Sequence, residues 1–341
     1  MTIIDLPHDQ RLGHLLSECD VLVADGAVGT NLFALGLETG DSPELWNVDH
    51  PDRVIRHHQA MVDARADIIL TNTFGGTRNR LKLHKSDDRV AELNTAAVRL
   101  ARQVADGADH PVLVAGSMGP TGEIMEPAGT LTPEAAISAF TEQAAALAAG
   151  GVDVLWIETI SCEEEAAAAI DGAARTGLPI VCTMTFDTNG RTMMGVTPEA
   201  AAVFYTSAWP ELAAFGANCG NGFGELVAAV AGIDVACDSD RVLVAKANCG
   251  IPEYVDGDIR YTGTPEMMKS YARLARDAGA RIIGGCCGST PAHIAALVEA
   301  LDGYPRGARP TLEAIDATLG LSWAAPRLDG EGRQRRSRRR A

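Results

Sequence analysis

Positive charge is scarce in this chain of 341 residues, in which 29 Lys and Arg stand against 45 Asp and Glu and give a formal charge of -16. Most of such a surface repels a phosphate backbone, so we expect no nucleic-acid binding. The exception is the C-terminus, where residues 333–340 read RQRRSRRR. Because a block of like charges repels itself, we predict a disordered tail over residues 333–341.

Long apolar runs are also missing. Nowhere do 18 apolar residues follow one another, and residues 1–10 lack the basic and apolar stretches of a secretory signal. We therefore expect a cytoplasmic protein without a membrane segment. The eight cysteines are spread through a large chain, which favours buried thiols or metal ligands over disulfides in a reducing compartment.

Short apolar runs rich in Val and Ile recur along the chain, and stretches with helical spacing follow them. Eight segments have the pattern of strands: residues 21–26, 66–74, 112–119, 153–159, 179–186, 213–220, 241–250 and 280–288. Near-continuous apolar strands separated by helices imply parallel pairing with both faces covered. Eight such units in about 300 residues predict an α/β fold, a closed (β/α)8 TIM barrel in a single domain.

An open doubly wound sheet is the competing fold, but residues 25–30 read DGAVGT and lack the Gly-rich dinucleotide fingerprint. Helix starts are marked by Thr-Pro pairs, in which Thr is the N-cap and Pro the first helical residue: 132–133, 197–198, 264–265 and 290–291. We expect a helical lead-in over 1–20, the barrel over 21–305 and a C-terminal extension over 306–332, before the tail.

Cysteines stand where two of the predicted strands end, and in such barrels the active site is built at the C-terminal strand ends. Cys219 ends the sixth strand, and Cys286 and Cys287 end the eighth. A catalytic Zn²⁺ takes three protein ligands and keeps one position open, so we predict these three as zinc ligands. Adjacent residues on a regular strand point to opposite faces, so the pair shares a metal only if the flanking glycines allow a bend. The alternative is three buried core thiols.

With these motifs in place, the chain resembles the homocysteine S-methyltransferases. The family pairs a G-x-N-C turn with a later G-G-C-C-G, matched here by residues 216–219 and 284–288, and the similarity runs from about Asp25 to Leu301. The resemblance implies a zinc-containing barrel that methylates homocysteine to methionine. It also makes Asn248 a weaker candidate for the open zinc position in the empty site, with Cys249 as a competing fourth sulfur or a core thiol.

The resemblance further implies a place for the amino acid head of homocysteine. Backbone N–H groups of the turn at 26–29, which includes Gly26 and Ala27, are expected to hold the carboxylate. Glu158, at the end of an otherwise apolar strand, is expected to accept from the ammonium group or to have a structural partner. Asp25 is expected to contact the substrate, unless it only caps its own turn.

The methyl donor is expected to be a small onium compound. Members of the superfamily use betaine, S-methylmethionine, dimethylsulfonio compounds or methyltetrahydrofolate through cobalamin, and the large folate and cobalamin modules have no counterpart in these 341 residues. Trp46 resembles the tryptophan that contacts betaine in the betaine enzymes, since aromatic faces bind quaternary ammonium. The alternative for Trp46 is a loop anchor. Phe74 is a weaker donor contact, and Gly75 and Thr159 stand where the animal enzymes carry tyrosines.

The sequences of residues 44–54, 75–84 and 191–195 look most like those of bacterial betaine-homocysteine methyltransferases. The expected partners are therefore homocysteine and a small methyl donor, with a homo-oligomer left open. The alternative donor is S-methylmethionine or a dimethylsulfonium acid. A hypothesis of another class is a zinc- or thiol-binding barrel without turnover.

Overall fold

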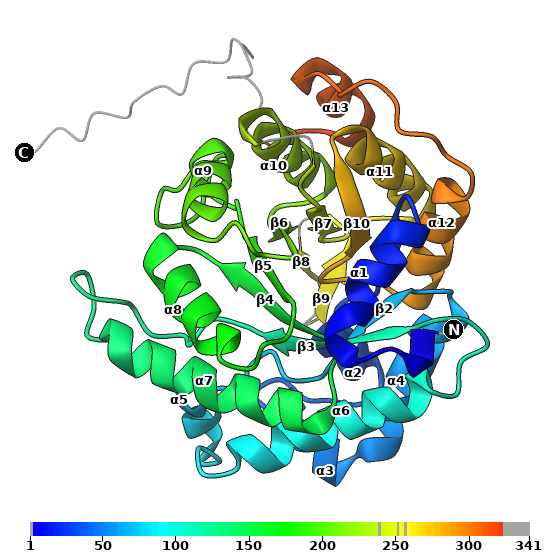
Figure 1. Cartoon of the computed structure of the whole chain (residues 1–341). Coiled ribbons are helices and arrows are strands. Elements are labelled where there is room, and N and C mark those ends of the chain that lie inside the picture. Colours follow the sequence, from blue (N-terminus) through cyan, green and yellow to red (C-terminus); the bar gives the residue numbers. More distant parts are fainter. Residues whose placement is uncertain (1–2, 238–239, 251, 256–257, 323–341) are drawn as a thin grey trace, which may run out of the picture.

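The computed structural model of the chain describes residues 3–237, 240–250, 252–255 and 258–322, and it contains the predicted closed barrel (Figure 1). Its parallel strands close in the order β1-β10-β7-β6-β5-β4-β3-β2. Their bounds are β1 Leu22–Ala24, β2 Ile68–Leu70, β3 Leu113–Met118, β4 Val154–Ile160, β5 Ile180–Met184, β6 Ala214–Cys219, β7 Leu243–Ala247 and β10 Ala280–Gly285. All eight predicted strands are confirmed, and the fold is a single-domain (β/α)8 TIM barrel.

Helices surround the barrel (Figure 1). They are α1 His8–Glu18, α2 Val28–Ala34, α3 Trp46–Asp49, α4 Pro51–Asp63, α5 Arg78–Leu81, α6 Val90–Ala105, α7 Pro133–Gly150, α8 Glu163–Ala174, α9 Pro198–Ala208, α10 Phe223–Ala236, α11 Pro265–Asp277, α12 Pro291–Leu301 and α13 Leu312–Leu319. The four Thr-Pro pairs begin α7, α9, α11 and α12 as predicted. At Thr132, Thr197 and Thr264 the hydroxyl also accepts a hydrogen bond from the backbone N–H three residues later, a cap that contributes about 1 kcal/mol.

Helix α1, inside the predicted lead-in, packs against the inner side chains of the barrel. Leu12 and Leu15 join a buried cluster with strand residues such as Leu22 and Trp156. The fully buried Asp153 carboxylate fixes this packing, since it accepts hydrogen bonds from Arg11 (3.0 Å) and from Arg102 (3.0 Å) and lies 2.6 Å from His8 Nδ1. One end of the barrel is thereby closed around a paired charge.

A two-stranded antiparallel hairpin, β8 Pro252–Val255 and β9 Asp258–Tyr261, interrupts the connection from β7 to α11. This hairpin was not predicted, because strands of four residues carry too few positions to show an alternation pattern.

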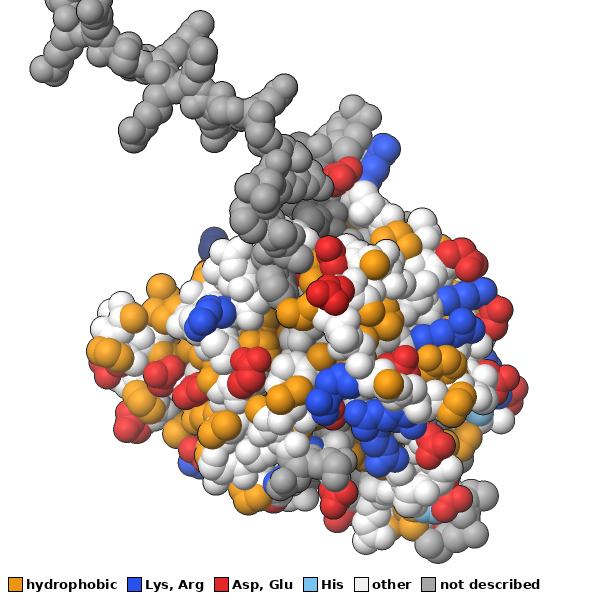
Figure 2. Space-filling model, turned by 90° about the horizontal axis from the view of Figure 1, so that it is seen from above, with side chains coloured by type: hydrophobic (Ala, Val, Ile, Leu, Met, Phe, Trp, Pro, Cys, Tyr) orange, Lys and Arg blue, Asp and Glu red, His pale blue; other side chains and the backbone are white. Residues whose placement is uncertain are grey.

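Beyond the barrel, α13 falls in the predicted C-terminal extension, whereas the predicted tail over 333–341 lies outside the described residues. In the part of the chain that the structure covers, none of the helices combines the length and apolarity needed to cross a bilayer. On the face shown in Figure 2, acidic and basic side chains both lie among hydrophobic ones.

Candidate metal and substrate site

The three cysteines predicted as metal ligands come together in the fold. Cys219 is the last residue of β6, and Cys286 and Cys287 follow directly after β10. Their sulfur atoms all lie within 4.8 Å of one another. They are the metal-ligating cluster found among the described residues, from two stretches of chain more than sixty positions apart in sequence. The geometry required by the prediction is therefore present.

Local backbone conformation brings the sulfurs to one point. Cys219 has a left-handed backbone (φ 62°), and Gly220 after it is also left-handed (φ 78°). A non-glycine residue with positive φ is uncommon, and such residues gather at functional sites. Strand β10 ends at Gly285, and Gly288 turns the chain with a φ of 79°. The bend that lets Cys286 and Cys287 share one side thus occurs where the sequence placed glycines.

Two asparagine side chains lie against the sulfur atoms. The Asn248 amide donates to Cys219 Sγ (3.4 Å) and to the Gly220 carbonyl (2.6 Å), while its oxygen accepts from the Cys287 N–H (2.9 Å). The Asn218 amide lies 3.9 Å from Cys286 Sγ. Asn248 is therefore next to the cluster, as predicted, but its oxygen is occupied by the backbone of Cys287.

The thiols differ in pKa from ordinary cysteines. A hydrogen bond with Cys286 lowers the pKa of Cys219, but the hydrogen bond with Cys287, burial and the charge of Cys287 outweigh it and raise that pKa to about 12. Three converging thiols that stay protonated need a cation to become thiolates, and a soft, closely spaced sulfur set fits Zn²⁺. Cys249 lies outside this cluster: it is fully buried, and its sulfur is 3.3 Å from the Ser289 hydroxyl.

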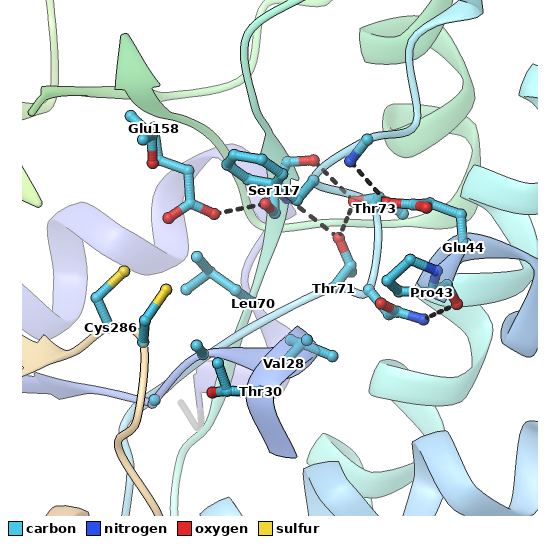
Figure 3. A pocket seen from close by; sticks show the side chains of 18 of the residues that line it. Val28, Thr30, Pro43, Glu44, Leu70, Thr71, Thr73, Ser117, Glu158 and Cys286 are labelled. Atoms are coloured by element: carbon cyan, nitrogen blue, oxygen red, sulfur yellow. Dashed lines mark hydrogen bonds between the residues drawn. The ribbon is translucent and has the colours of Figure 1, made fainter. Parts of the chain in front are cut away.

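The three cysteines lie on the wall of a cavity of about 370 Å³, a volume typical of small-molecule sites. Glu158, at the end of β4, points into the same cavity, as does Cys286 (Figure 3). The Glu158 carboxylate accepts a hydrogen bond of 2.6 Å from the Ser117 hydroxyl. Burial raises the pKa of Glu158, and the nearby charge of Lys246 partly opposes that rise. Glu158 thus has the structural partner that the sequence alternative required, and it remains available to a ligand.

Lys246 is a buried cation inside the barrel that was not predicted as a site residue. Its side chain is 2 % exposed and its Nζ lies 3.1 Å from Asp25 Oδ1, while Asp25 Oδ2 accepts from the Leu70 N–H (2.8 Å). Burial lowers the pKa of Lys246, but Asp25 and Glu158 outweigh it and raise that pKa. Both oxygens of Asp25 are engaged within the barrel, and Asp25 does not line the cavity. Asp25 is therefore the countercharge of Lys246, and its contact with the substrate stays a prediction.

The turn that precedes α2 lines the cavity through Gly26, Ala27, Val28 and Gly29. Among the described residues, no backbone carbonyl or side chain accepts from the N–H groups of Gly26 and Ala27. Gly26 is also required for space, because a Cβ there would lie 2.8 Å from the Ser289 carbonyl oxygen. This turn can therefore offer backbone donors to an anion.

Aromatic side chains lie toward the outer part of the cavity wall, but not all of those expected. Phe74 lines the cavity and is 37 % exposed, and Phe33, which the sequence analysis missed, lines it as well and is 47 % exposed. Trp46 is 5 % exposed, packs in a cluster with Leu32 and is covered by the Arg53 guanidinium 4.8 Å from its ring centre. It does not line the cavity. Trp46 thus has the packing of the loop anchor that was its alternative, and its contact with the donor stays a prediction.

The absence of a tyrosine after Phe74 has a local explanation. The Gly75 N–H donates to the buried Glu44 carboxylate (2.7 Å), and Ser42 donates to the other oxygen of Glu44 (2.7 Å). A Cβ on Gly75 would lie 2.8 Å from Glu44 Oε1. A buried carboxylate therefore occupies the space that a larger side chain at this position would need.

The chain belongs to the homocysteine S-methyltransferase family, whose model matches residues 22–301. Among solved structures it is similar to the homocysteine methyltransferase MmuM from Escherichia coli. The oxidized form of that protein has a TM-score of 0.71 and the metallated form 0.70, each at 26 % identity over 84 % of this chain and 98 % of theirs.

Among curated proteins, the chain is 30 % identical to the methionine synthase of Mycobacterium tuberculosis over 319 residues, which is 89 % of this chain and 26 % of that protein. The methionine synthase of Mycobacterium leprae is 30 % identical over 311 residues, or 85 % of this chain and 25 % of that protein. The chain therefore spans about a quarter of the length of these two relatives.

Proposed function

We propose that this chain moves a methyl group from a small onium donor, glycine betaine first among the candidates, to the sulfur of homocysteine. The products are methionine and, from betaine, dimethylglycine. The observation that carries the proposal is the convergence of Cys219, Cys286 and Cys287 within 4.8 Å on the wall of a cavity that also holds Glu158. Membership of the family supports homocysteine as the acceptor.

We assign Cys219, Cys286 and Cys287 as the residues that hold a zinc ion. This assignment fits their chemistry, because catalytic zinc sites use three protein ligands and leave one position for a substrate. When bound, the ion lowers the pKa of a thiol in that position, so that homocysteine is presented as a thiolate near neutral pH. None of the described cysteines forms a disulfide, which suits the reducing cytoplasm that we propose as the location.

The remaining residues hold the amino acid head of homocysteine. Glu158 accepts from its ammonium group, and Lys246 favours the ionised form of Glu158 across the barrel. The N–H groups of Gly26 and Ala27 donate to its carboxylate. Asn218 and Asn248 position the cysteine sulfurs by the contacts already described. Each charged end of the amino acid thereby meets an opposite charge or dipole.

The donor lies over the aromatic part of the wall. A cationic onium group is attracted to aromatic faces by about 0.5 to 2 kcal/mol per ring, and Phe33 and Phe74 are the rings that line the cavity. In the transfer, the new bond joins the methyl carbon to the homocysteine sulfur as the bond from that carbon to the donor heteroatom breaks. The electron pair of the broken bond stays with the donor, which loses its positive charge.

Metal content and methionine formation test the proposal together. The purified chain is expected to contain one zinc per molecule and to form methionine from homocysteine with glycine betaine in a panel that includes S-methylmethionine and dimethylsulfonioacetate. Activity with a sulfonium donor and none with betaine would make the sulfonium compound the donor in place of betaine. Tight homocysteine binding without turnover on any donor would favour the non-catalytic barrel. Full activity of a zinc-free Cys286→Ala, Cys287→Ala variant would refute the mechanism.

A further inference from the structure

We propose that Arg80 forms a carboxylate-binding subsite at the donor end of the cavity, so that this chain selects onium donors that carry a carboxylate. The inference rests on the proposed function and adds the residue that binds the carboxylate of the donor. It starts from the position of Arg80 on the wall of the cavity that holds the three cysteines and Phe74.

The backbone places Arg80 on this wall. Phe74 and Arg80 belong to the same connection after β2, six positions apart, and Arg80 lies in α5. The Thr77 hydroxyl caps that helix by accepting from the Arg80 N–H (3.4 Å). The Arg80 guanidinium packs against the backbone of Gly122, where a Cβ would come within 2.9 Å of Nη1. Glycine at 122 thus leaves the space that this half-buried side chain occupies.

Arg80 lacks the partner that its neighbours have. Arg78, on the same helix, makes a two-pronged contact with Glu142, and Asn79 donates to Glu123 (2.8 Å). Among the described residues, no carboxylate oxygen lies within 4.0 Å of the Arg80 guanidinium. The carboxylates that line the same cavity have other partners. Glu44 is held by Gly75 and Ser42, Asp41 accepts from the Glu38 N–H (3.3 Å), and Glu158 accepts from the Ser117 hydroxyl.

The two cationic side chains on the cavity wall, Lys246 and Arg80, therefore differ in whether they have a carboxylate partner. Lys246 is neutralised by Asp25 at 3.1 Å, so it adds no unpaired positive charge for a ligand. Of the Lys and Arg side chains that line the cavity, Arg80 is the one that has no carboxylate partner among the described residues. A guanidinium offers its N–H groups in a planar fork that matches a carboxylate. The anion that completes this part of the wall then comes from the donor.

An onium acid fits both features of this connection. Its cationic centre would face Phe74 and its carboxylate would face Arg80, since both side chains line the cavity. The carboxylate neither gains nor loses a bond during the transfer, so Arg80 acts on binding and orientation. Arg80 is therefore a specificity-determining residue. Its substitution is expected to raise the KM of the donor more than it lowers kcat.

Two sulfonium donors separate this role from a general effect. Dimethylsulfonioacetate and trimethylsulfonium both offer a methyl group on a positive sulfur, and the first alone carries a carboxylate. Arg80→Gln is expected to raise the KM of dimethylsulfonioacetate at least about tenfold, the loss typical of a charge-assisted hydrogen bond. It should leave kcat/KM for trimethylsulfonium and the KM of homocysteine unchanged. Arg80→Lys should recover part of the loss, and Arg78→Gln should behave as the wild type.

The outcomes distinguish the two proposals. Equal effects of Arg80→Gln on both donors, or no effect on either, would overturn the subsite while leaving methyl transfer intact. If none of the onium donors allows the wild-type chain to methylate homocysteine, the proposed function is refuted. In that case calorimetric binding of the same two sulfonium compounds to the wild type and to Arg80→Gln still decides the inference. The inference is supported if the wild type binds dimethylsulfonioacetate more tightly than trimethylsulfonium and Arg80→Gln does not. It is overturned if the wild type binds the two compounds equally.

Discussion

Removal of the buried cation Lys246 should destabilise the barrel strongly, because it leaves Asp25 without its countercharge. The two side chains are 2 % and 0 % exposed and lie 3.1 Å apart. Breaking such a pair from one side costs about 3–5 kcal/mol, since an uncompensated charge stays buried. We expect Lys246→Met to lower the free energy of unfolding at pH 7.5 by about this amount.

The cost should depend on pH in a defined direction. Burial raises the pKa of Asp25 and Lys246 lowers it, so removal of Lys246 raises that pKa further. A carboxyl group whose pKa is higher in the folded than in the unfolded state stabilises the fold at low pH, and this stabilisation is lost as the pH rises through the folded pKa. The deficit of the variant should therefore be smaller at pH 5 than at pH 7.5.

Urea unfolding followed by tryptophan fluorescence and by circular dichroism measures these differences, and coincident transitions justify a two-state treatment. Asp25→Asn combined with Lys246→Met should recover most of the lost stability, because both charges are gone. Lys269→Met, which removes an exposed ion pair with Glu299, is the matched control and should behave as the wild type. The reasoning is refuted if the single variant is as stable as the wild type, or if the double variant is no more stable than the single one.

Three further predictions follow from the site and its surroundings. Phe74→Ala should raise the KM of the onium donor about 3- to 30-fold through loss of one aromatic face and leave the KM of homocysteine unchanged; an unchanged donor KM in steady-state assays would remove Phe74 from the site. Glu158→Gln should raise the KM of homocysteine about tenfold or more with zinc content unchanged, whereas Glu165→Gln, outside the cavity, should not; equal effects would contradict the ammonium role. Burial, with the charge of Lys246, lowers the pKa of His57 to about 4. Below pH 6.5 the unfolded chain therefore binds a proton at His57 that the folded chain does not bind. About 3 kcal/mol of the free energy of unfolding should be lost as the pH falls from 6.5 to 4. Urea midpoints against pH should show this loss in the wild type and in the control His84→Gln but a smaller loss in His57→Gln, and parallel curves would argue against it.

The fold could be predicted from the sequence because each strand is buried on both faces and is therefore apolar along its length. Runs such as 112–119 need no partner to be recognised, and Thr132-Pro133 marks the following helix start by its own chemistry. The β8–β9 hairpin lacks such a signal, because its pairing depends on the turn between two four-residue strands.

The site was predictable where residue chemistry is rare and was missed where it depends on packing. Cys219, Cys286 and Cys287 identify themselves at strand ends, and the structure brings them together. Lys246 carried a signal that was not used, since a charge inside an apolar strand has to be paired. Trp46 was assigned to the donor by its residue type, but whether an aromatic ring faces a cavity or a core is decided by tertiary packing.

The sequence could not show where the side chains of Asp25 and Phe33 point, for the same reason. Asp25 follows β1 next to the substrate turn, and only the position of Lys246 on β7, 221 residues later, shows where its carboxylate points. Phe33 lies in α2, and its exposure on the cavity wall follows from how that helix packs. Contacts between distant segments determine both side chains.

The central claim is that three cysteine sulfurs hold one zinc ion with a position left for homocysteine. X-ray absorption at the zinc edge of the purified chain tests it most directly. We predict three sulfur ligands at about 2.3 Å and a fourth after addition of homocysteine, with the metal lost in Cys219→Ser. A zinc shell of nitrogen and oxygen ligands, or a shell that does not change when homocysteine is added, would contradict the account.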